Sequence, residues 1–185
     1  MTEVKVLITG YLMHEPESDG RIGCTVTLVR DNDKNIIVDP GGIRTSDQII
    51  KMLEKENLTA DHIDFVFLTH CHYDHFKNIG QFPNATVIEY QGAWNNDRIS
   101  SRKQKFFSDN IEIVKTPGHS RDSMSLVVKT EIGIIAIVGD LWWQENYPIF
   151  DKVAENNDVL AIERAKMLVL ADYVIPGHSG MFKTK

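Results

Sequence analysis

Short apolar runs recur along this chain, and several of them end in a turn that carries a histidine or an aspartate. The runs are rich in valine and isoleucine, which favour the pleated, half-buried surface of a β-sheet. Rigid strands that present polar side chains on the loops after them are the usual framework of a functional site. The runs that predict strands are Val4–Ile8, Thr25–Val29, Ile36–Val38, Phe65–Leu68, Thr86–Ile88, Ile111–Val114, Ser125–Val128, Ile132–Val138 and Tyr173–Ile175.

Two helices are also indicated. Ser46 or Asp47 can cap a helix that runs to about Glu56, and its apolar face is formed by Ile49, Ile50 and Leu53. A second helix is expected over about Asp158 to Leu170, and the residues we expect it to bury are Leu160, Ala161, Ala165, Leu168 and Val169. Strands in runs, with helices between them, predict an α+β fold in which helices cover two packed sheets. The length of 185 residues suits a single domain over 1–185.

The most specific motif is the segment Thr69–His75, which reads T-H-C-H-Y-D-H directly after a predicted strand. His70 and His72 are two residues apart, so both imidazoles project to the same side of an extended segment and can reach one cation. Asp74 and His75 begin the next turn and can reach a second cation nearby. Imidazole nitrogen and carboxylate oxygen suit Zn²⁺, and also Fe or Mn.

One segment cannot surround two metal ions, so further ligands must come from elsewhere in the chain. His119, Asp140 and His178 each follow an apolar strand and are the candidates. Together with the four side chains of the motif they make seven candidate ligands, which is too many for one four-coordinate ion. The sequence therefore predicts two metals. Cys71, between two of the histidines, is expected to be a small buried side chain rather than a ligand.

Five segments in this order resemble the metallo-β-lactamase-fold hydrolases. They are Asp39 in I-V-D-P-G-G, the H-C-H-Y-D-H motif at 70–75, His119 in T-P-G-H-S, Asp140 in V-G-D and His178 in I-P-G-H. T-V-T-L-V-R at 25–30, T-P-G-H-S-R-D-S at 116–123 and A-D-Y-V-I-P-G-H at 171–178 are similar to the small, single-domain subgroup called metallo-β-lactamase domain-containing protein 1. The resemblance implies a four-layer αββα sandwich. The segment Phe76–Gly80, F-K-N-I-G, departs from the usual pair of glycines.

The resemblance also implies roles for the candidate residues. Metal 1 would be held by His70, His72 and His119, and metal 2 by Asp74, His75 and His178. Asp140 would bridge the two ions and orient the attacking hydroxide, so Asp74 and Asp140 are the residues assigned to catalysis. Asp39 would support the ligand loop through hydrogen bonds. The expected cofactors are two Zn²⁺ ions, with Fe or Mn as alternatives.

This scheme predicts hydrolysis of an ester, thioester, lactam or phosphodiester by a metal-bridging hydroxide. One alternative is a metal-dependent ribonuclease that acts on RNA phosphodiesters. Another is a persulfide dioxygenase with a single iron, against which the complete second set of ligands argues. A metal-binding module without catalysis is the third, and the same complete set of ligands argues against it.

Several residues are candidates for contacting the substrate. Trp142 and Trp143 follow Asp140 and would either wall the pocket or serve packing alone. Arg121 follows His119 and would either bind an anionic group or, as we favour, form a surface salt bridge. Tyr11 and His14 lie on an early loop of the kind that overhangs such sites. If the substrate is RNA, a tryptophan is expected to stack on a base, and the candidates are Trp142, Trp143 and also Trp94, which is followed by Arg98 and Arg102.

The net charge of −6 argues against a general nucleic-acid binder, so a small-molecule or phosphodiester substrate is favoured over RNA. No apolar run approaches the roughly 20 residues of a membrane span, which predicts no membrane partner. The N-terminus lacks the pattern of a secretory signal, and Cys24 and Cys71 are too few for a disulfide framework. We therefore expect a cytoplasmic protein, and a homodimer is compatible with the sequence.

Overall fold

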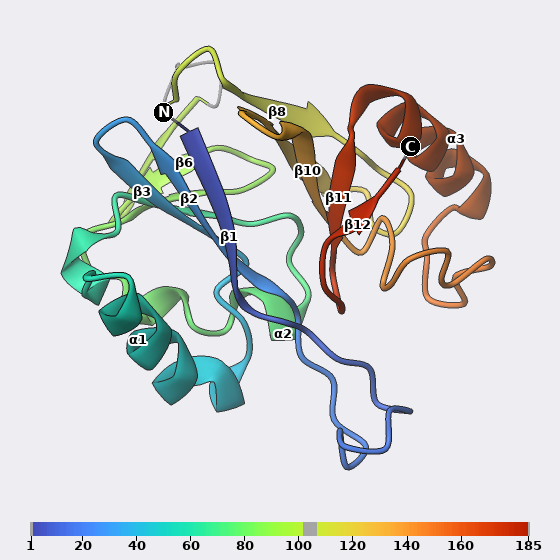
Figure 1. Cartoon of the computed structure of the whole chain (residues 1–185), viewed down its shortest axis with the longest axis horizontal. Coiled ribbons are helices and arrows are strands. Elements are labelled where there is room, and N and C mark those ends of the chain that lie inside the picture. Colours follow the sequence, from blue (N-terminus) through green and yellow to red (C-terminus); the bar gives the residue numbers. More distant parts are fainter. Residues whose placement is uncertain (1, 102–106, 185) are drawn as a thin grey trace.

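Two β-sheets face each other in the computed structural model, which describes residues 2–101 and 107–184 (Figure 1). The first sheet has the strand order β1-β2-β3-β4-β5-β6-β7 and the second β12-β11-β10-β9-β8. The strands of the first sheet are β1 (Thr2–Ile8), β2 (Val26–Asp31), β3 (Lys34–Val38), β4 (Phe65–Phe67), β5 (Thr86–Ile88), β6 (Ala93–Asn95) and β7 (Arg98–Ser100). Those of the second are β8 (Ile111–Lys115), β9 (Met124–Thr130), β10 (Gly133–Gly139), β11 (Tyr173–Pro176) and β12 (Phe182–Lys183).

Parallel pairs lie near the middle of both sheets, and helical crossovers connect them. β3, β4 and β5 are mutually parallel, linked through α1 (Ser46–Lys55) and α2 (Tyr73–Phe76). β10 and β11 are parallel and are joined through α3 (Asn157–Leu170). Short 3-10 turns lie at η1 (Ile43–Thr45), η2 (Ala60–His62) and η3 (Ile79–Gln81). Because parallel strands end on the same edge of a sheet, the loops after β3, β4, β10 and β11 gather at one end of the sandwich.

Three apolar clusters separate four layers. Val29, Phe67 and Leu126 belong to the cluster between the two sheets. Ile49 and Leu53 of α1 pack on the outer face of the first sheet, and Leu160 and Met167 of α3 pack on the outer face of the second. Burying each such side chain stabilises the fold by about 1.5–3 kcal/mol. The predicted α+β class and the four-layer αββα order are confirmed (Figure 1).

Every apolar run that predicted a strand matches one, with ends that differ by at most two residues. The strands that sequence reasoning missed are β6, β7 and β12, which are no longer than β4 and β5 but, unlike them, interrupt their apolar residues with Asn95, Arg98, Ser100 or Lys183. The helix after Ser46 is also confirmed, with Ile49 and Leu53 buried and Ile50 only partly so. Within residues 2–101 and 107–184, no helix has the length and apolarity needed to cross a membrane.

The expected buried face of α3 is wrong. Leu160 is buried as predicted, but Glu163 and Met167 complete the inward face. The other expected core positions, Ala161, Ala165, Leu168 and Val169, are exposed. Apolar residues occur all round this helix, so periodicity alone does not choose a face. Its orientation is set at its start, where the Asn156 side chain accepts hydrogen bonds from the backbone N–H groups of Asp158 and Val159.

Candidate metal centre

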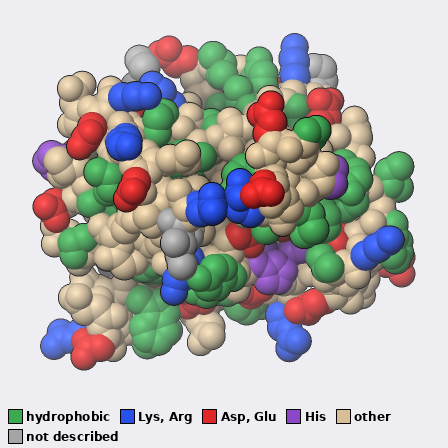
Figure 2. Space-filling model, turned by 90° about the horizontal axis from the view of Figure 1, so that it is seen from below, with side chains coloured by type: hydrophobic (Ala, Val, Ile, Leu, Met, Phe, Trp, Pro, Cys, Tyr) green, Lys and Arg blue, Asp and Glu red, His purple; other side chains and the backbone are tan. Residues whose placement is uncertain are grey.

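The seven predicted ligands meet at the end of the sandwich where the loops after β4, β8, β10 and β11 converge. They form two groups, and within each group the ligand atoms all lie within 4.8 Å of one another. In the space-filling view from this end, histidine side chains appear together in a hollow of the surface (Figure 2). The first group is His70, His72, His119 and Asp140, and the second is Asp74, His75 and His178.

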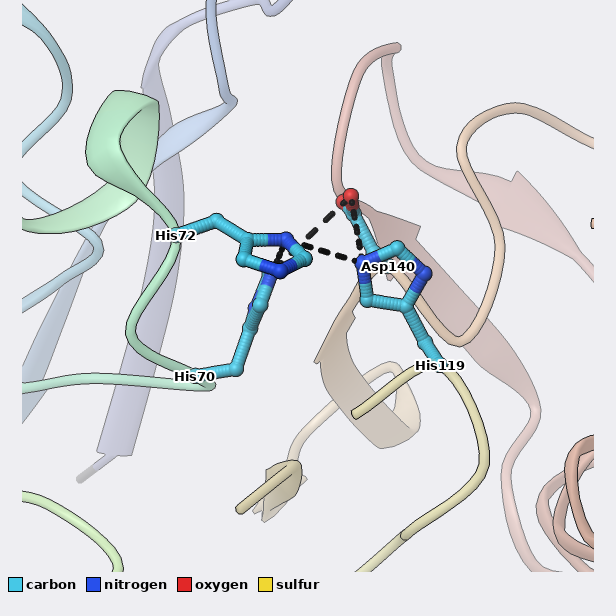
Figure 3. A group of neighbouring side chains, drawn as sticks. All are labelled: His70, His72, His119 and Asp140. Carbon is cyan, nitrogen blue, oxygen red and sulfur yellow. Dashed lines mark hydrogen bonds and ion pairs between the residues drawn. The ribbon is translucent and has the colours of Figure 1, made fainter. Parts of the chain in front are cut away.

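Asp140 lies between the two groups. Its Oδ1 is 3.3 Å from Nε2 of His75 and 3.2 Å from Nε2 of His178. Its Oδ2 is 3.4 Å from Nε2 of His119 and 3.9 Å from Nε2 of His70. Figure 3 shows this carboxylate facing the imidazoles of the first group. Oδ1 therefore faces the second group, while Oδ2 lies between the two groups, 3.4 Å from Nε2 of both His119 and His178.

The loop after β3 holds the ligands of the adjacent strand through Asp39. This buried carboxylate accepts hydrogen bonds from Nδ1 of His75 at 2.8 Å and from the backbone N–H of Thr69 at 2.8 Å. The Thr69 hydroxyl donates to Asp39 Oδ2 at 2.6 Å. Its oxygen can therefore accept from Nδ1 of His70, which lies 3.1 Å away. Both histidines are thereby held with Nε2 free to face the centre, as metal-binding histidines are.

A second buried carboxylate, Asp151, supports His119. Both residues follow strands of the second sheet, whereas Asp39 follows a strand of the first. Oδ2 of Asp151 accepts from Nδ1 of His119 at 2.7 Å, and its Oδ1 accepts from the backbone N–H of Val153 at 2.9 Å. Sequence reasoning missed Asp151 because it lies in an irregular loop after Phe150, with no neighbouring ligand and no motif around it. The one available signal was an aspartate that follows an apolar run, which is too common to single it out.

His178 is oriented by main chain rather than by a carboxylate. Its Nδ1 donates to the carbonyl oxygen of Gly23 at 3.0 Å, a contact that no spacing rule in the sequence suggests. The preceding Gly177 has no room for a side chain, because a Cβ there would lie 1.9 Å from Asp140 Oδ1. The turn after β11 thus requires glycine in order to place His178 against the bridging position of Asp140.

His72 is the exposed member of the cluster. Its Nδ1 lies 3.0 Å from Nε2 of both His70 and His119. Three imidazole nitrogens therefore converge from two sheets on one point (Figure 3). The exposure of His72 marks the side from which solvent and ligands reach the centre.

Electrostatics favour the metal-binding protonation states of His70 and Asp140, whereas the Asp140 carboxylate outweighs the effect of burial and raises the pKa of His75 and of His178. Burial, with the neighbouring imidazole of His75, lowers the pKa of His70 well below its usual value. Burial by itself would raise the pKa of Asp140, but the imidazoles of His178 and His75 hold it well below the usual range. A neutral His70 and an anionic Asp140 at neutral pH are the forms required of metal ligands.

Unpaired buried atoms test whether a cation fits. Among the described residues, Asp74 Oδ2, His75 Nε2 and Asp140 Oδ1 are buried without a hydrogen-bond partner. Leaving a buried polar atom unpaired costs about 1–3 kcal/mol, and all three point into the same cluster. A divalent cation would satisfy them, and a set of imidazole nitrogens and carboxylate oxygens suits Zn²⁺, Fe or Mn. The residues fit a metal.

Of the expected substrate contacts, Trp142 is misplaced. It is buried in the cluster between the second sheet and α3, beneath the guanidinium of Arg164, and does not wall the site. Trp143 does lie beside the centre, with its ring 6.4 Å from that of His178. The two tryptophans lie in the turn after β10, which places one of them in the core and the other beside the centre.

The remaining expected contacts divide between the rim and the open surface. His14 lies on the rim, packed edge-on against Tyr147, which in turn contacts Trp143. Arg121 is 86% exposed and pairs with Glu155 at 3.3 Å, which fits a surface ion pair. Cys71 is exposed, contrary to the buried position expected of it.

Trp94, the other tryptophan considered for RNA, donates from Nε1 to Glu89 at 2.7 Å, and Arg98 is exposed on β7. Arg102 lies outside the described residues. Trp94 is only half-buried, but its one polar group is already occupied by an acidic neighbour. This segment therefore offers no ready-made platform for a nucleobase.

Comparisons with known proteins agree with this geometry. Residues 19–109 match the metallo-beta-lactamase superfamily. The chain is 34% identical to a probable metallo-hydrolase of Methanocaldococcus jannaschii, over 96% of this chain and 87% of that protein. It is 26% identical to metallo-beta-lactamase domain-containing protein 1 of Xenopus laevis, over 97% and 81%. A crystal structure of a candidate metallo-beta-lactamase from Thermotoga maritima superposes with a TM-score of 0.77 at 23% identity, over 98% and 99%.

Proposed function

The chain belongs to the metallo-beta-lactamase superfamily of metal-dependent hydrolases, and from this premise we propose that it uses two divalent ions to cleave an ester, thioester or phosphodiester bond. The observation that carries the proposal is the position of Asp140, whose carboxylate oxygens lie 3.2 to 3.4 Å from imidazole nitrogens of both ligand groups. A carboxylate shared in this way suits two ions better than one. Seven ligands also exceed the number that a single four-coordinate zinc takes.

The roles proposed for the side chains follow from their contacts. His70, His72 and His119 would hold one ion, and Asp74, His75 and His178 the other. When bound, such ions supply a nucleophilic hydroxide near neutral pH and stabilise the charge that develops on the oxygen under attack. Asp140, anionic and aimed at the space between both groups, would orient the attacking oxygen by accepting its proton in a hydrogen bond. Asp39 and Asp151 keep the imidazoles of His75 and His119 in the tautomer that leaves Nε2 unprotonated.

Zinc is the metal we propose, because the ligands are imidazole and carboxylate, the set that catalytic zinc sites use. Fe or Mn would accept the same set. A dioxygenase with one iron would leave Asp74, His75 and His178 without a function, although they lie as close together as the first group. Because Cys24 and Cys71 are free thiols, we also propose a reducing compartment such as the cytoplasm.

A small ester or a small phosphodiester is favoured over RNA as the substrate. The burial of Trp142 removes one expected base-stacking platform, and the net charge of −6 leaves little basic surface for a polymer. Trp143, half-buried beside His178, is better suited to form an apolar wall. Ribonuclease activity remains the alternative, and a steep fall of RNA cleavage with rising salt would be its signature.

The experiment is metal analysis of the purified protein with and without Asp140→Ala, followed by an assay on ester, thioester, lactam and phosphodiester substrates. We expect about two ions per wild-type chain, and activity that is lost on chelation and restored by zinc. Asp140→Ala should remain folded, bind the second ion more weakly and lose activity by orders of magnitude. One tightly bound iron under metal-replete conditions would contradict the proposal, as would an Asp140→Ala variant of wild-type activity.

A further inference from the structure

A pocket of about 360 Å³ opens directly beside the candidate metal centre. Asp74 and Gly23, which respectively belong to the second ligand group and support His178, form part of its lining. The same pocket is lined by Arg21 and Arg44, and Tyr73 contributes an aromatic side chain. No ligand role was assigned to either arginine by the sequence motifs. A substrate bound at Asp74 would extend into this space.

The two arginines also line an adjoining hollow of about 390 Å³ that does not include Asp74. Since Arg21 and Arg44 are shared by both hollows, they lie where the two meet. The arginines are therefore placed to meet a ligand that reaches outward from the centre.

Arg44 is held by the same segment that carries the ligands. It lies in η1, where Thr45 Oγ1 donates to the carbonyl oxygen of Gly42 at 2.7 Å. The buried Asn78 side chain donates to Thr45 Oγ1 at 2.8 Å and to the carbonyl oxygen of Pro40 at 3.1 Å. Asn78 follows His75 by three residues, within the segment that departs from the family's pair of glycines. Asn78 thus ties the turn that carries Arg44 to the segment that carries the metal ligands.

Arg21 lies on a loop that is tied internally and to the centre. Its backbone N–H donates to the carbonyl oxygen of Ser18 at 3.2 Å, and the buried Ser18 hydroxyl lies 2.8 Å from the carbonyl oxygen of Glu15. The loop closes through two backbone hydrogen bonds between Tyr11 and Gly23, at 2.9 and 3.1 Å. The Gly23 carbonyl that accepts from His178 therefore also anchors this wall of the pocket.

The charges leave guanidinium groups available. Arg44 is exposed and has no ion-pair partner in the part of the chain that the structure describes. Arg21 pairs through Nη1 with Asp19, which is 82% exposed, and the rest of its donors are open. Two acids line the outer hollow: Glu15, which already accepts hydrogen bonds from the Leu12 backbone and from Gln144, and Glu17, which forms no ion pair with either arginine among the described residues. A guanidinium fork matches the oxygens of a carboxylate or phosphate in two-point hydrogen bonds.

We propose that Arg44, with Arg21, binds an anionic oxygen group at the end of the substrate remote from the bond that is cleaved. This assigns the substrate class as esters or thioesters that carry a second, acidic end, a carboxylate or a phosphate. The inference rests on the proposed hydrolase function for the cleaved end. Binding of the acidic end depends only on the arginine pocket, so the two can be tested separately.

The binding test is calorimetric titration of the zinc-loaded full-length chain with butyrate, glutarate and 3-phosphonopropionate. All three can place a carboxylate at the metal centre, but only the last two carry a second anionic group. We expect at least one of them to bind about tenfold more tightly than butyrate, and the tighter one identifies the group as carboxylate or phosphate-like. The advantage should fall to about twofold or less in the double variant Arg21→Gln/Arg44→Gln.

Lys51→Gln, which removes an exposed cation from α1, is the matched control and should keep the full advantage. Arg44→Gln alone provides a second reading if the double change disturbs the loop. Equal binding of all three ligands by the wild type would overturn the proposal, as would an advantage that survives in the double variant.

A hydrolysis assay separates the proposed anion site from the proposed hydrolase function on which it rests. The mono-p-nitrophenyl ester of glutarate should show a higher kcat/KM than p-nitrophenyl butyrate, and Arg44→Gln should remove most of that difference. Metal-dependent cleavage of both esters at equal rates would leave the hydrolase function intact and refute the anion site. Tighter binding of the dianions by a protein that cleaves no ester would refute the ester substrate and keep the site.

Discussion

Two buried carboxylates, Asp39 and Asp151, hold histidines of the candidate metal centre from opposite sheets, and each does so differently. Asp39 directly follows β3 and accepts from His75, from the Thr69 backbone and from the Thr69 hydroxyl. Asp151 lies in the loop between β10 and α3 and accepts from His119 and from the next turn of its own loop, at Val153. The distances to the two imidazoles, 2.8 and 2.7 Å, are nearly the same.

The difference lies in what else each carboxylate holds. Through Thr69, Asp39 orients His70 as well as His75, so it serves both ligand groups and ties β3 to β4. Asp151 serves His119 alone, and its loop exposes Ile149 and Phe150 to solvent. The loop is anchored by the Asn157 side chain, which bonds the backbone N–H and carbonyl of Asp151, both at 2.9 Å. Asp39 directly follows a strand of the first sheet, whereas Asp151 lies in an irregular loop between β10 and α3.

The largest expected effect is that of Asp39→Asn. All the groups that face Asp39 are donors, and an amide supplies an acceptor at only one of its two terminal atoms. We expect metal affinity and activity to fall about 100-fold, the upper end for a residue that orients ligands. Metal content, together with kcat/KM at saturating zinc, measures this loss.

Asp33→Asn, which changes an exposed aspartate in the turn before β3, is the matched control and should behave as wild type. A loss of tenfold or less in Asp39→Asn would mean that Thr69 and His75 keep their orientation without the carboxylate. The two sides of the centre would then be equivalent, and the contrast between them would disappear.

Asp151→Asn should cost less, about tenfold in metal affinity. Its side-chain oxygen can still accept from His119 if the amide nitrogen turns toward Val153, so one interaction is lost rather than several. Asp151→Ala removes both bonds and should approach the loss seen in Asp39→Asn. If Asp151→Asn proved as damaging as Asp39→Asn, the loop would have to orient more of the centre than His119.

Chelation sharpens the contrast further. Without metal, the orientation of His119 no longer affects affinity, whereas Asp39 still joins β3 to the segment after β4 through Thr69. In chelator-treated protein we expect Asp39→Asn to lower the free energy of unfolding by about 2 kcal/mol and Asp151→Asn by about 1 kcal/mol. Urea denaturation of both variants and the wild type gives the difference. Equal losses would show that Asp151 supports the fold as strongly as Asp39 does.

The same contrast governs how far the site could be predicted from sequence. Asp39 and the segment His70 to His75 each directly follow a predicted strand and lie in recognisable motifs, so both could be singled out although the Asp39–His75 contact spans 36 residues. Asp151 acts on His119, 32 residues away, through a contact that only the tertiary fold creates, and no motif surrounds it. The same holds for Gly23, whose carbonyl supports His178 from the other end of the chain.

The fold divides along similar lines. α1 has a single apolar face, so periodicity predicted Ile49 and Leu53 as buried. α3 carries apolar residues on several faces, and its buried side is decided by the Asn156 cap and by the close approach of Gly118 to Leu160. Val169 consequently lies 77% exposed although it is apolar. Trp142 was misplaced because its position after Asp140 does not show which of the two tryptophans faces the centre: Trp143 does, whereas Trp142 packs in the cluster beneath α3.

The smallest expected effect is that of Arg121→Gln, two residues after the histidine that Asp151 holds. Arg121 is 86% exposed and pairs with Glu155, itself 45% exposed, and exposed pairs typically contribute little to stability. We expect metal content to be unchanged, kcat/KM to stay within about twofold and the unfolding midpoint to match that of the wild type. The arginine would then be ruled out as an anion-binding residue beside His119. A selective rise in KM for anionic substrates, with kcat unchanged, would instead return Arg121 to the site and show that the side held by Asp151 also contacts substrate.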